Sequence, residues 1–499
     1  MSAILADIIP DLLIGDDKTA QSVDLDTLEI VTDSRKAAAD TLFFAIPGTK
    51  VDGTQFIPDA VAKGCRAIVA EAPHEKQQSA DFKYIQVSDV REACSRCHRH
   101  INNLPDEKLD IFGVTGTNGK TTTVYLLRHF LNILSCKCAM ISTVEFDDTS
   151  CVAPPTHTTP DPDTLFALLD RAVKNNAMCA AMEFSSHALE QKRLAGIQLK
   201  AAILTNVTGD HLDFHKTMEN YFAAKRKLFT VYLRPGGVAV LNADDTYARA
   251  LAAELHKVRP DIRVVTFGGV PEADYRICEA QSTGEFCSFL LHTPDGKKLP
   301  INFPLPGAYN IHNLAGVLTA LLSCGADPEL ILAGCQTSLR IPGRLELLKR
   351  EDGAKFYIDF AHTHDALQNV LTTLRHCCKG RLIVLFGCGG DRDKTKRPLM
   401  GKAASQYADI TIVTSDNPRS ENPETIISEI VSGIEQAAVF FTVADRREAI
   451  KKANAIAQVD DIVLIAGKGH ENYQEINGVK YDFDDMDELK KCFEYKSTL

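Results

Sequence analysis

The stretch "GTNGKTT" at residues 116–122 has the residue types of a phosphate-binding loop. Its glycines let backbone N–H groups converge on an anion at a helix N-terminus, and Lys120 can reach the outer phosphates, while a threonine hydroxyl can ligate Mg²⁺. The strict pattern G-x-x-x-x-G-K-[ST] fails, because Val114 stands five residues before Gly119. We still predict a nucleotide site here, since an apolar run precedes the loop and helical spacing follows it.

Polar and ionisable side chains, most of them carboxylates and imidazoles, follow two later apolar runs. They are Glu183, Ser185 and His187 in "MEFSSH", and Asp210, His211 and His215 in "TNVTGDHLDFH", with Lys225 in the helix-like "YFAAKRKLF". Beside a phosphate-binding loop these side chains are candidate magnesium ligands, although Mg²⁺ prefers oxygen to nitrogen. A lone histidine is more often structural, so the neighbouring loop is what favours a functional interpretation.

Length and charge narrow the class of protein. The chain has 499 residues, enough for about three domains. Its 55 Lys and Arg against 66 Asp and Glu give a net charge of −11, which argues against nucleic acid or an anionic membrane as the main partner. The start "MSAILADIIPDLLIG" lacks a basic segment and a cleavage site, and no apolar run approaches the roughly 18 residues of a membrane span. We expect a soluble cytoplasmic protein.

Fifteen scattered cysteines are expected to be reduced thiols. The string "CSRCH" at 94–98 spells a haem-attachment pattern, and Cys94, Cys97, His98 or His100 could in principle bind a metal. The string lies in helix-like sequence without a second ligand cluster, so we interpret it as part of an ordinary helix.

Strand-like and helix-like runs alternate along most of the chain and predict an α/β protein with parallel sheets. Residues 1–103 form a small N-terminal α/β domain in this interpretation, 104–341 a central P-loop domain with a parallel or mixed sheet, and 342–499 a C-terminal Rossmann-like domain. In the last region the strand-like runs end in "GCGGDRDKTKR", "SDNPRSE", "ADRRE" and "GKGHEN". Ligands of open parallel sheets bind at the carboxyl ends of strands, so these four loops are a candidate site.

Motifs in a fixed order then connect the whole chain to a known family. They are "TDSR" at 32–35, "IPGTKVDG" at 46–53, "GTNGKTT" at 116–122, "TTPD" at 158–161, "EFSSHAL" at 183–189, "DHLDFH" at 210–215, "YFAAKRKLF" at 221–229, "LNADD" at 241–245, "GAYNIHN" at 307–313, "PGRLE" at 342–346, "DFAHTHDAL" at 359–367, "GCGGDRDKTKRPLM" at 387–400, "DNPR" at 416–419 and "GKGHE" at 467–471. Through these motifs the sequence resembles the Mur ligases, in the branch that adds the third residue of the peptidoglycan stem.

The resemblance implies a role for each motif. ATP would contact Gly116, Thr117, Asn118, Gly119, Lys120, Thr121, Thr122, Asn313, Arg344 and Asp359. The UDP-linked substrate would contact Thr32, Ser34, Thr49, Lys50, Val51, His157, Thr158, Thr159, Ser185, Gln191 and Arg193. The incoming amino acid would contact Arg392, Asp416, Asn417, Pro418, Arg419, Gly467 and Glu471. Catalysis would depend on Lys120, Lys225, Glu183 and His211, with Mg²⁺ held by Thr121, Glu183, His211 and Lys225, the last as a carbamylated lysine.

The implied reaction is an ATP-dependent amide ligation in cytoplasmic peptidoglycan precursor synthesis, and hence in cell-wall biogenesis, cell shape and cell division. The D-glutamyl carboxylate of UDP-N-acetylmuramoyl-L-alanyl-D-glutamate would attack the γ-phosphate, and an amino acid would capture the acyl phosphate. We expect meso-diaminopimelate rather than L-lysine, because Arg419 offers a planar fork for the additional carboxylate. We also expect a monomer.

Three alternatives stay open at this stage: another Mur-type or folylpolyglutamate-type ligase, a P-loop ATPase that drives motion, and a nucleotide-binding scaffold without turnover. One departure from the family pattern is visible, because the usual "AHTP" reads "AHTH". His364 therefore stands where a proline would fix the backbone, and we expect a less rigid loop on the ATP side without loss of activity.

Overall fold

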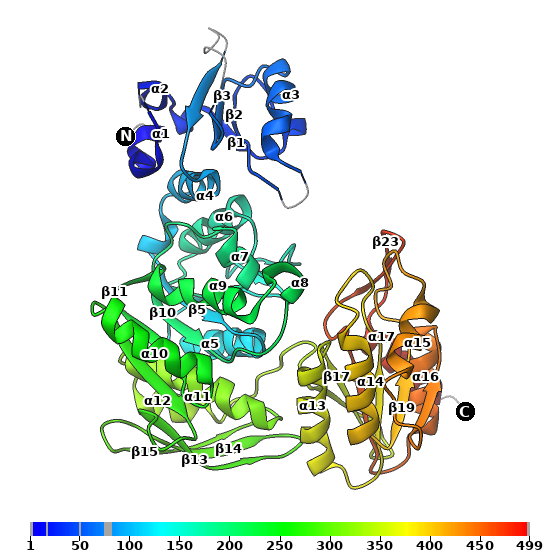
Figure 1. The fold of residues 1–499 in the computed structure, drawn as a ribbon. Coiled ribbons are helices and arrows are strands. Elements are labelled where there is room, and N and C mark those ends of the chain that lie inside the picture. Colours follow the sequence, from blue (N-terminus) through cyan, green and yellow to red (C-terminus); the bar gives the residue numbers. More distant parts are fainter. Residues whose placement is uncertain (1–2, 16–17, 49–50, 74–81, 497–499) are drawn as a thin grey trace.

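A computed structural model describes residues 3–15, 18–48, 51–73 and 82–496. Three α/β domains follow one another along the chain (Figure 1). Each of the three main sheets is formed by one continuous stretch of sequence. The predicted fold class is therefore confirmed, while the exact boundaries after residues 103 and 341 stay predictions.

The N-terminal domain contains a parallel four-stranded sheet in the order β1-β2-β3-β4. Its elements are α1 (Leu5–Ile8), α2 (Lys18–Gln21), β1 (Glu29–Val31), β2 (Thr41–Phe44), α3 (Ile57–Ala62), β3 (Ala67–Ala70), β4 (Lys83–Gln86) and α4 (Val90–Ile101). Strands β2 and β3 are buried throughout, as expected for strands covered on both faces. The "CSRCH" string lies in α4, with Cys94, Cys97 and His98 buried.

The central domain holds an eleven-stranded mixed sheet in the order β15-β14-β13-β12-β11-β10-β5-β9-β6-β7-β8. Its strands are β5 (Asp110–Thr115), β6 (Cys138–Ile141), β7 (Phe146–Asp147), β8 (Val152–Ala153), β9 (Cys179–Glu183), β10 (Leu199–Leu204), β11 (Leu233–Asn242), β12 (Arg263–Gly268), β13 (Tyr275–Ser282), β14 (Cys287–His292) and β15 (Lys298–Phe303). Its helices are α5 (Lys120–Ile133), α6 (Pro162–Lys174), α7 (Ser186–Glu190), α8 (Leu212–His215), α9 (Met218–Thr230), α10 (Thr246–Val258), α11 (Ala308–Ser323) and α12 (Pro328–Gly334).

The parallel centre of this sheet determines where a ligand can bind. Strand β5 pairs in parallel with β10 on one side and β9 on the other, and helices cover both faces of the sheet. The carboxyl ends of the three strands therefore meet at one edge, and the 116–122 loop emerges there.

The C-terminal domain contains a six-stranded sheet in the order β16-β17-β21-β18-β19-β20, parallel except for β16. Its strands are β16 (Glu346–Lys349), β17 (Lys355–Asp359), β18 (Leu382–Phe386), β19 (Ile410–Val413), β20 (Val439–Thr442), β21 (Ile462–Ala466), β22 (Tyr473–Ile476) and β23 (Val479–Asp482), the last two forming a separate hairpin. Its helices are α13 (His364–Cys377), α14 (Lys396–Tyr407), α15 (Pro423–Val431), α16 (Arg446–Ile456) and α17 (Asp485–Lys496). Apolar clusters on the two faces of the sheet make this the predicted doubly wound layer.

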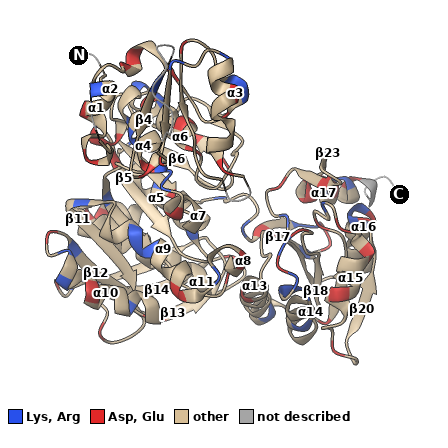
Figure 2. Ribbon diagram, turned by 45° about the horizontal axis from the view of Figure 1, so that its top comes forward, with Lys and Arg blue, Asp and Glu red and all other residues tan. Residues whose placement is uncertain are grey.

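The four strand-like runs that the sequence places before the C-terminal loops are confirmed as β18, β19, β20 and β21. The antiparallel meander β13–β15 and the antiparallel edge strand β16 were not predicted, because burial largely alternates along the meander and β16 is partly exposed throughout, so that neither presents a continuous buried run. Charges of both signs occur in all three domains in the view of Figure 2. Within the described residues, no helix is both long and apolar enough for a membrane span.

Two glycines allow α14 and α15 to pack closely. A Cβ atom on Gly401 would lie 2.1 Å from the carbonyl oxygen of Ile430, and one on Gly433 would lie 1.9 Å from that of Pro398. Both obstacles are backbone atoms, so the helices would have to move apart.

We therefore expect Gly401→Ala to destabilise the C-terminal domain although alanine favours a helix by about 1 kcal/mol. Overpacking typically costs about 1–3 kcal/mol, and here it acts against backbone. The midpoint of the thermal transition should fall by several degrees relative to wild type. The exposed neighbour Lys402→Ala, which changes helix propensity without a close contact, is the matched control. A higher midpoint for Gly401→Ala would show that the helices are not held in contact.

Candidate active site

The 116–122 loop approaches two other segments so closely that glycine is required. Gly116 and Gly119 both have positive φ, at 149° and 87°. A Cβ atom on Gly116 would lie 1.9 Å from Oγ1 of Thr205, and one on Gly119 would lie 2.3 Å from Oδ1 of Asn313. The loop is thus fixed between β10 and α11, and Asn313, predicted as an ATP contact, lies directly over it.

The half-buried Lys120 and the buried Lys225 share one carbonyl of this loop. The ammonium of Lys120 donates to the carbonyl oxygens of Gly116 and Thr117, both at 2.9 Å, and that of Lys225 donates to Gly116 at 2.8 Å. Burial lowers the pKa of both lysines. The charge of Lys120 lowers the pKa of Lys225 further, so that it lies well below its usual value. The site is therefore rich in positive charge that an anion can neutralise.

Glu183, at the end of β9, is a fully buried carboxylate next to the loop. It accepts hydrogen bonds from the backbone N–H and the hydroxyl of Thr143, at 2.8 and 3.1 Å. Its negative charge favours the charged form of Lys120. Glu183 thus lies on the phosphate side of the site, as the sequence predicts.

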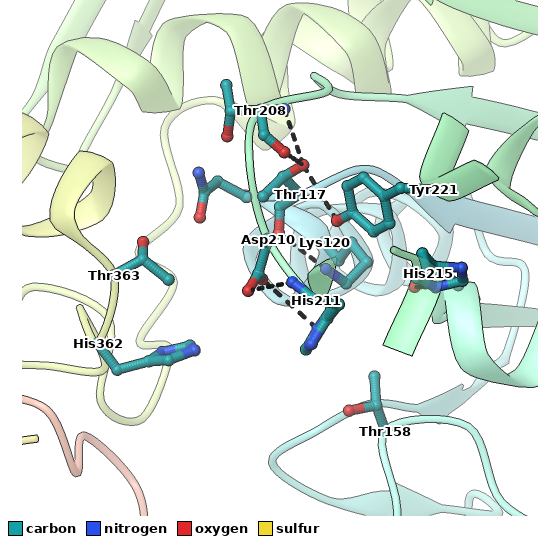
Figure 3. A network of polar contacts seen from close by, with 12 residues as sticks. Thr117, Lys120, Thr158, Thr208, Asp210, His211, His215, Tyr221, His362 and Thr363 are labelled. Atoms are coloured by element: carbon teal, nitrogen blue, oxygen red, sulfur yellow. Dashed lines mark hydrogen bonds and ion pairs between the residues drawn. The ribbon is translucent and has the colours of Figure 1, made fainter. Parts of the chain in front are cut away.

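Asp210 and His211 lie on the loop after β10, opposite the C-terminal domain (Figure 3). The Oδ1 atom of Asp210 accepts a hydrogen bond from the backbone N–H of His211 at 2.9 Å. Burial lowers the pKa of His211 to about 4, so its imidazole is neutral and keeps a lone pair for a ligand. The rings of His187 and His211 are 4.8 Å apart, while His215 contacts the hydroxyl of Ser186. His215 is thus structural and His211 faces the site.

A second set of predicted residues lies together beside the loop. Arg193 donates to the carbonyl oxygen of Thr159 at 2.9 Å and to Oε1 of Gln191. The hydroxyl of Thr159 accepts from the backbone N–H of Ser185 at 3.0 Å. The hydroxyl groups of Thr158 and Thr143 lie 3.2 Å apart, and His157 is exposed. These groups form one polar surface that continues from Glu183.

The other residues predicted for the UDP-linked substrate are in the N-terminal domain. Thr32 and Val51 are exposed, and the carbonyl oxygen of Ser34 accepts from Lys63 at 2.9 Å. Thr49 and Lys50 lie outside the described residues. These residues therefore lie in a different domain from the polar surface around Thr159 and Arg193.

The C-terminal domain contacts the phosphate loop directly. Arg344 donates to the hydroxyl of Thr121 at 3.0 Å, and His470 donates through Nε2 to the carbonyl oxygen of Thr143 at 3.1 Å. Asp359 accepts from the backbone N–H groups of Leu345 and Ala361, which shapes the turn after Arg344. Arg344 therefore contacts the loop itself, while Asp359 supports the turn behind it, and the ATP contacts of both residues stay predictions.

His364 is the first residue of α13, a position where proline is common in helices. The side chain of Thr363 caps the same helix by accepting from the backbone N–H of Ala366. The helix therefore begins in the usual way without a proline, because the cap supplies the local order.

The four predicted loops of the C-terminal domain lie together. Asn417 donates to Oε2 of Glu471 at 2.7 Å, and Arg419 donates to the carbonyl oxygen of Gly390 at 2.7 Å. A Cβ atom on Gly467 would lie 2.5 Å from Oδ2 of Asp416, so these loops touch. Burial, together with the charge of Asp416, raises the pKa of Glu471.

Arg392 and Pro418 border the same pocket. A Cβ atom on Gly389 would contact both Arg392 and Arg419, and one on Gly390 would lie 1.9 Å from the carbonyl oxygen of Pro418. The pocket therefore combines guanidinium groups with the carboxylates of Asp416 and Glu471, which suits a ligand that carries both charges.

Sequence reasoning assigned no role to several residues of the two sites. They are Thr143, Asn206, Tyr221, Lys468, His470 and Arg446. His470 and Lys468 lie inside the quoted "GKGHE", so their position was available although their contacts were not. Thr143 follows a short apolar strand without any motif, and only the fold brings it to Glu183.

Comparisons with known proteins agree with this geometry. Residues 29–101 match the model of the Mur ligase family catalytic domain, 114–321 that of the Mur ligase middle domain, and 343–469 that of the Mur ligase glutamate ligase domain. The chain is 41% identical over 477 residues to UDP-N-acetylmuramoyl-L-alanyl-D-glutamate--2,6-diaminopimelate ligase of Synechococcus elongatus, covering 94% of each chain. It is 40% identical to the ligase of the same name from Aquifex aeolicus, covering 93% of this chain and 92% of that one. A solved structure with this name has a TM-score of 0.68 and 34% identity and covers both chains completely.

We predict that Lys120→Met weakens nucleotide binding and leaves the binding of the UDP-linked substrate nearly unchanged. Loss of a buried ammonium that contacts phosphate costs about 2–5 kcal/mol, whereas the predicted uridine contacts belong to another domain. Calorimetric titration with ATP and with the UDP-linked substrate separates the two effects. Lys216→Met, at an exposed lysine of the neighbouring loop, is the control. Unchanged ATP affinity in Lys120→Met would remove the phosphate-loop assignment.

Proposed function

The chain belongs to the Mur ligase family, and from that premise we propose that it joins meso-diaminopimelate to the D-glutamate of UDP-N-acetylmuramoyl-L-alanyl-D-glutamate with hydrolysis of ATP to ADP and phosphate. The pocket of the four C-terminal loops is the observation that carries the choice of amino acid. Its guanidinium and carboxylate groups match the additional carboxylate and ammonium that distinguish diaminopimelate from lysine.

The reaction has two steps. A carboxylate oxygen of D-glutamate attacks the γ-phosphorus of ATP, so that the bond to ADP breaks and an acyl phosphate forms. The amine of diaminopimelate then attacks the acyl carbon, phosphate leaves, and an amide remains after the amine loses a proton. Such chemistry needs positioning and charge neutralisation rather than a protein nucleophile.

The loop residues Gly116 to Thr122 are proposed to bind the phosphates, with Lys120 on the outer ones. Its hydrogen bonds to two loop carbonyls hold the ammonium at the centre of the loop. Arg344 approaches Thr121 from the other domain and would add a second cation to the same phosphates. Asn313 and Asp359 complete this set on the ATP side.

Magnesium fits the residues present. Within the described chain, no three side chains of His, Cys, Asp and Glu form a ready metal cage. The fully buried carboxylate of Glu183 and the hydroxyl of Thr121 nevertheless flank the loop, and Mg²⁺ is usually held by one or two protein oxygens together with phosphate. We propose that Thr121 and Glu183 hold a first Mg²⁺ and that His211 and Lys225 hold a second. Bound there, Mg²⁺ would neutralise the charge of the triphosphate.

Lys225 is proposed to be carbamylated. A carbamate forms when a neutral amine attacks carbon dioxide and loses a proton, and burial keeps the pKa of Lys225 far below its usual value. The product is an oxygen ligand in place of an ammonium, which suits Mg²⁺.

The UDP-linked substrate is proposed to extend from the N-terminal domain to the polar surface beside Glu183. Thr32, Ser34 and the 49–51 segment would hold the uridine end. Thr158, Thr159, Ser185, Gln191 and Arg193 would hold the peptide end, and His157 borders it. We further propose a cytoplasmic monomer with domain boundaries after residues 103 and 341.

The alternative functions differ in which co-substrates are required before ADP is released. A P-loop ATPase would release it without an amino acid, a scaffold would release none, and a ligase requires both the UDP-linked dipeptide and an amino acid. A lysine-adding or folylpolyglutamate-type ligase would prefer another co-substrate.

We expect ADP release that depends on both co-substrates and a strong preference for meso-diaminopimelate over L-lysine in kcat/KM. Lysine lacks the additional carboxylate that Arg419 would bind besides its own partner Glu475, whose Oε2 lies 3.4 Å from Nε of Arg419, so lysine should bind more weakly. Arg419→Ala should lower kcat/KM for diaminopimelate and reduce the preference.

Arg375→Ala is the control for this experiment. Arg375 also combines a carboxylate partner, Asp409, with a backbone carbonyl, that of Gly380, but it lies away from the four loops. The control should keep the preference of the wild type. Equal use of lysine by the wild type, or an unchanged preference in Arg419→Ala, would contradict the assignment.

We predict that Lys225→Ala abolishes ligation and that short carboxylic acids restore part of it, because a small carboxylate can enter the space of the carbamate and supply the missing oxygen. Ligation is followed with and without added formate or acetate. Arg226→Ala, at the half-exposed neighbour that pairs with Glu254, is the control and needs no rescue. Turnover of Lys225→Ala at the wild-type rate would remove the carbamate hypothesis.

A further inference from the structure

The loop "ADRRE" ends at the same edge of the sheet as the amino-acid pocket, yet no residue in it has been given a role so far. Arg446 is its buried member, with a side chain that is 0% exposed. It is also the first residue of α16, where the helix dipole disfavours a positive charge. The positive charge of Arg446 therefore does not stabilise its own helix, and the burial of this side chain needs another explanation.

Asp485 holds the guanidinium from one side. Its two oxygens accept from Nε and Nη2 of Arg446, both at 2.7 Å, and Asp485 is also 0% exposed. This bidentate pair fixes the plane of the fork. The remaining N–H groups consequently point in defined directions.

Those N–H groups point to the two loops of the amino-acid pocket. Nη2 donates to the carbonyl oxygen of Ala466 at 2.9 Å, and Nη1 lies 3.4 Å from that of Ser415. Ala466 directly precedes Gly467, and Ser415 directly precedes Asp416. One side chain thus contacts the backbone at the start of both loops.

The sheet joins these two loops only through a third strand. They follow β21 and β19, and β18 lies between those two strands. No ladder of hydrogen bonds therefore joins β19 to β21. Arg446 spans this gap from the helix layer and connects the two strand ends directly.

The guanidinium also acts on the charges of the pocket. Besides Asp485, the carboxylates of Asp416 and Glu471 raise the pKa of Arg446. Coulomb interactions are mutual, so Arg446, together with the ammonium of Lys468, counteracts the burial that raises the pKa of Glu471. An ionised carboxylate is what the ammonium of an amino acid needs.

We propose that Arg446 is a positioning residue for the amino-acid site, which sets the spacing of the 415–419 and 466–471 loops through their carbonyl groups and has Asp485 as its counterion. The proposal rests on the proposed function of this pocket. It does not require Arg446 to contact the substrate.

The first test is Arg446→Lys, which keeps the charge but loses the planar fork. We expect KM for the amino acid to rise about 10- to 100-fold, because displaced loops lose oriented contacts, while KM for ATP and for the UDP-linked dipeptide stays within about twofold. Arg350→Lys is the matched control. Arg350 is likewise buried, forms a fork with Asp352 and donates to the carbonyls of Asn454 and Ala457, but it lies outside the pocket.

A second variant separates positioning from stability. Arg446→Met combined with Asp485→Leu replaces the buried pair by apolar side chains, which is often neutral for folding. This variant should unfold near the wild-type temperature, show faster hydrogen exchange in the 414–419 and 466–471 loops, and have a raised KM for the amino acid only. Wild-type KM values together with wild-type exchange in both loops would overturn the proposal.

The test of Arg446 can be distinguished from the test of the proposed amino-acid preference. Each KM is measured with whichever amino acid the wild type ligates, so a wild type that prefers lysine contradicts the choice of diaminopimelate and leaves the test of Arg446 intact. Equal rises of all three KM values, or the same pattern in Arg350→Lys, would show a general structural role and overturn the positioning role.

Discussion

The carbonyl oxygen of Gly116 accepts hydrogen bonds from the side chains of both Lys120 and Lys225, and this shared acceptor brings the two lysines together at the phosphate loop. Lys120 and Lys225 come from different helices, yet both point at one loop. Two positive charges at low dielectric are costly unless anions lie close. Glu183 and Asp210 supply part of that charge, and the phosphates of a nucleotide would supply the rest. The burial that makes the lysines costly without a ligand thereby makes the site selective for highly anionic ones.

The same constraint explains the position of the C-terminal domain. Strand ends of one sheet can surround a phosphate on one side only, so the other side needs groups from elsewhere. Arg344 and His470 fill this role through Thr121 and Thr143, and Figure 3 shows His362 and Thr363 facing Asp210 and His211 across the site. The site is therefore complete only when two domains are adjacent. A ligase that joins three substrates needs such an arrangement, because each domain can bind its own substrate before the reacting atoms meet.

Much of this arrangement could be predicted from the sequence, for reasons that differ between residues. The loop at 116–122 and the strands of the C-terminal sheet depend on local patterns, in which glycine, apolar runs and helix spacing are visible directly. Thr143 and Arg446 could not be assigned, since their partners are 40 and 39 residues away, in the case of Glu183 and Asp485, and depend on how the sheets order their strands. The meander β13–β15 was not predicted for another reason, because its half-exposed strands lack continuous apolar runs. The sequence therefore predicts motifs formed by neighbouring residues, whereas it does not predict contacts between residues far apart in the chain.

The "GKGHE" loop shows how a short segment can serve two sites. Gly467 and Glu471 border the amino-acid pocket, while His470 between them donates to Thr143, which in turn holds Glu183. Burial lowers the pKa of His470 to about 4, so the ring is neutral at physiological pH, and its one N–H lies on Nε2, which faces the carbonyl oxygen of Thr143. Because loop residues two or three positions apart cannot move independently, the pocket for the amino acid and the carboxylate beside the phosphates are held in a fixed relation. The backbone of one loop thus connects the proposed site of the amino acid to the place where the acyl phosphate would form.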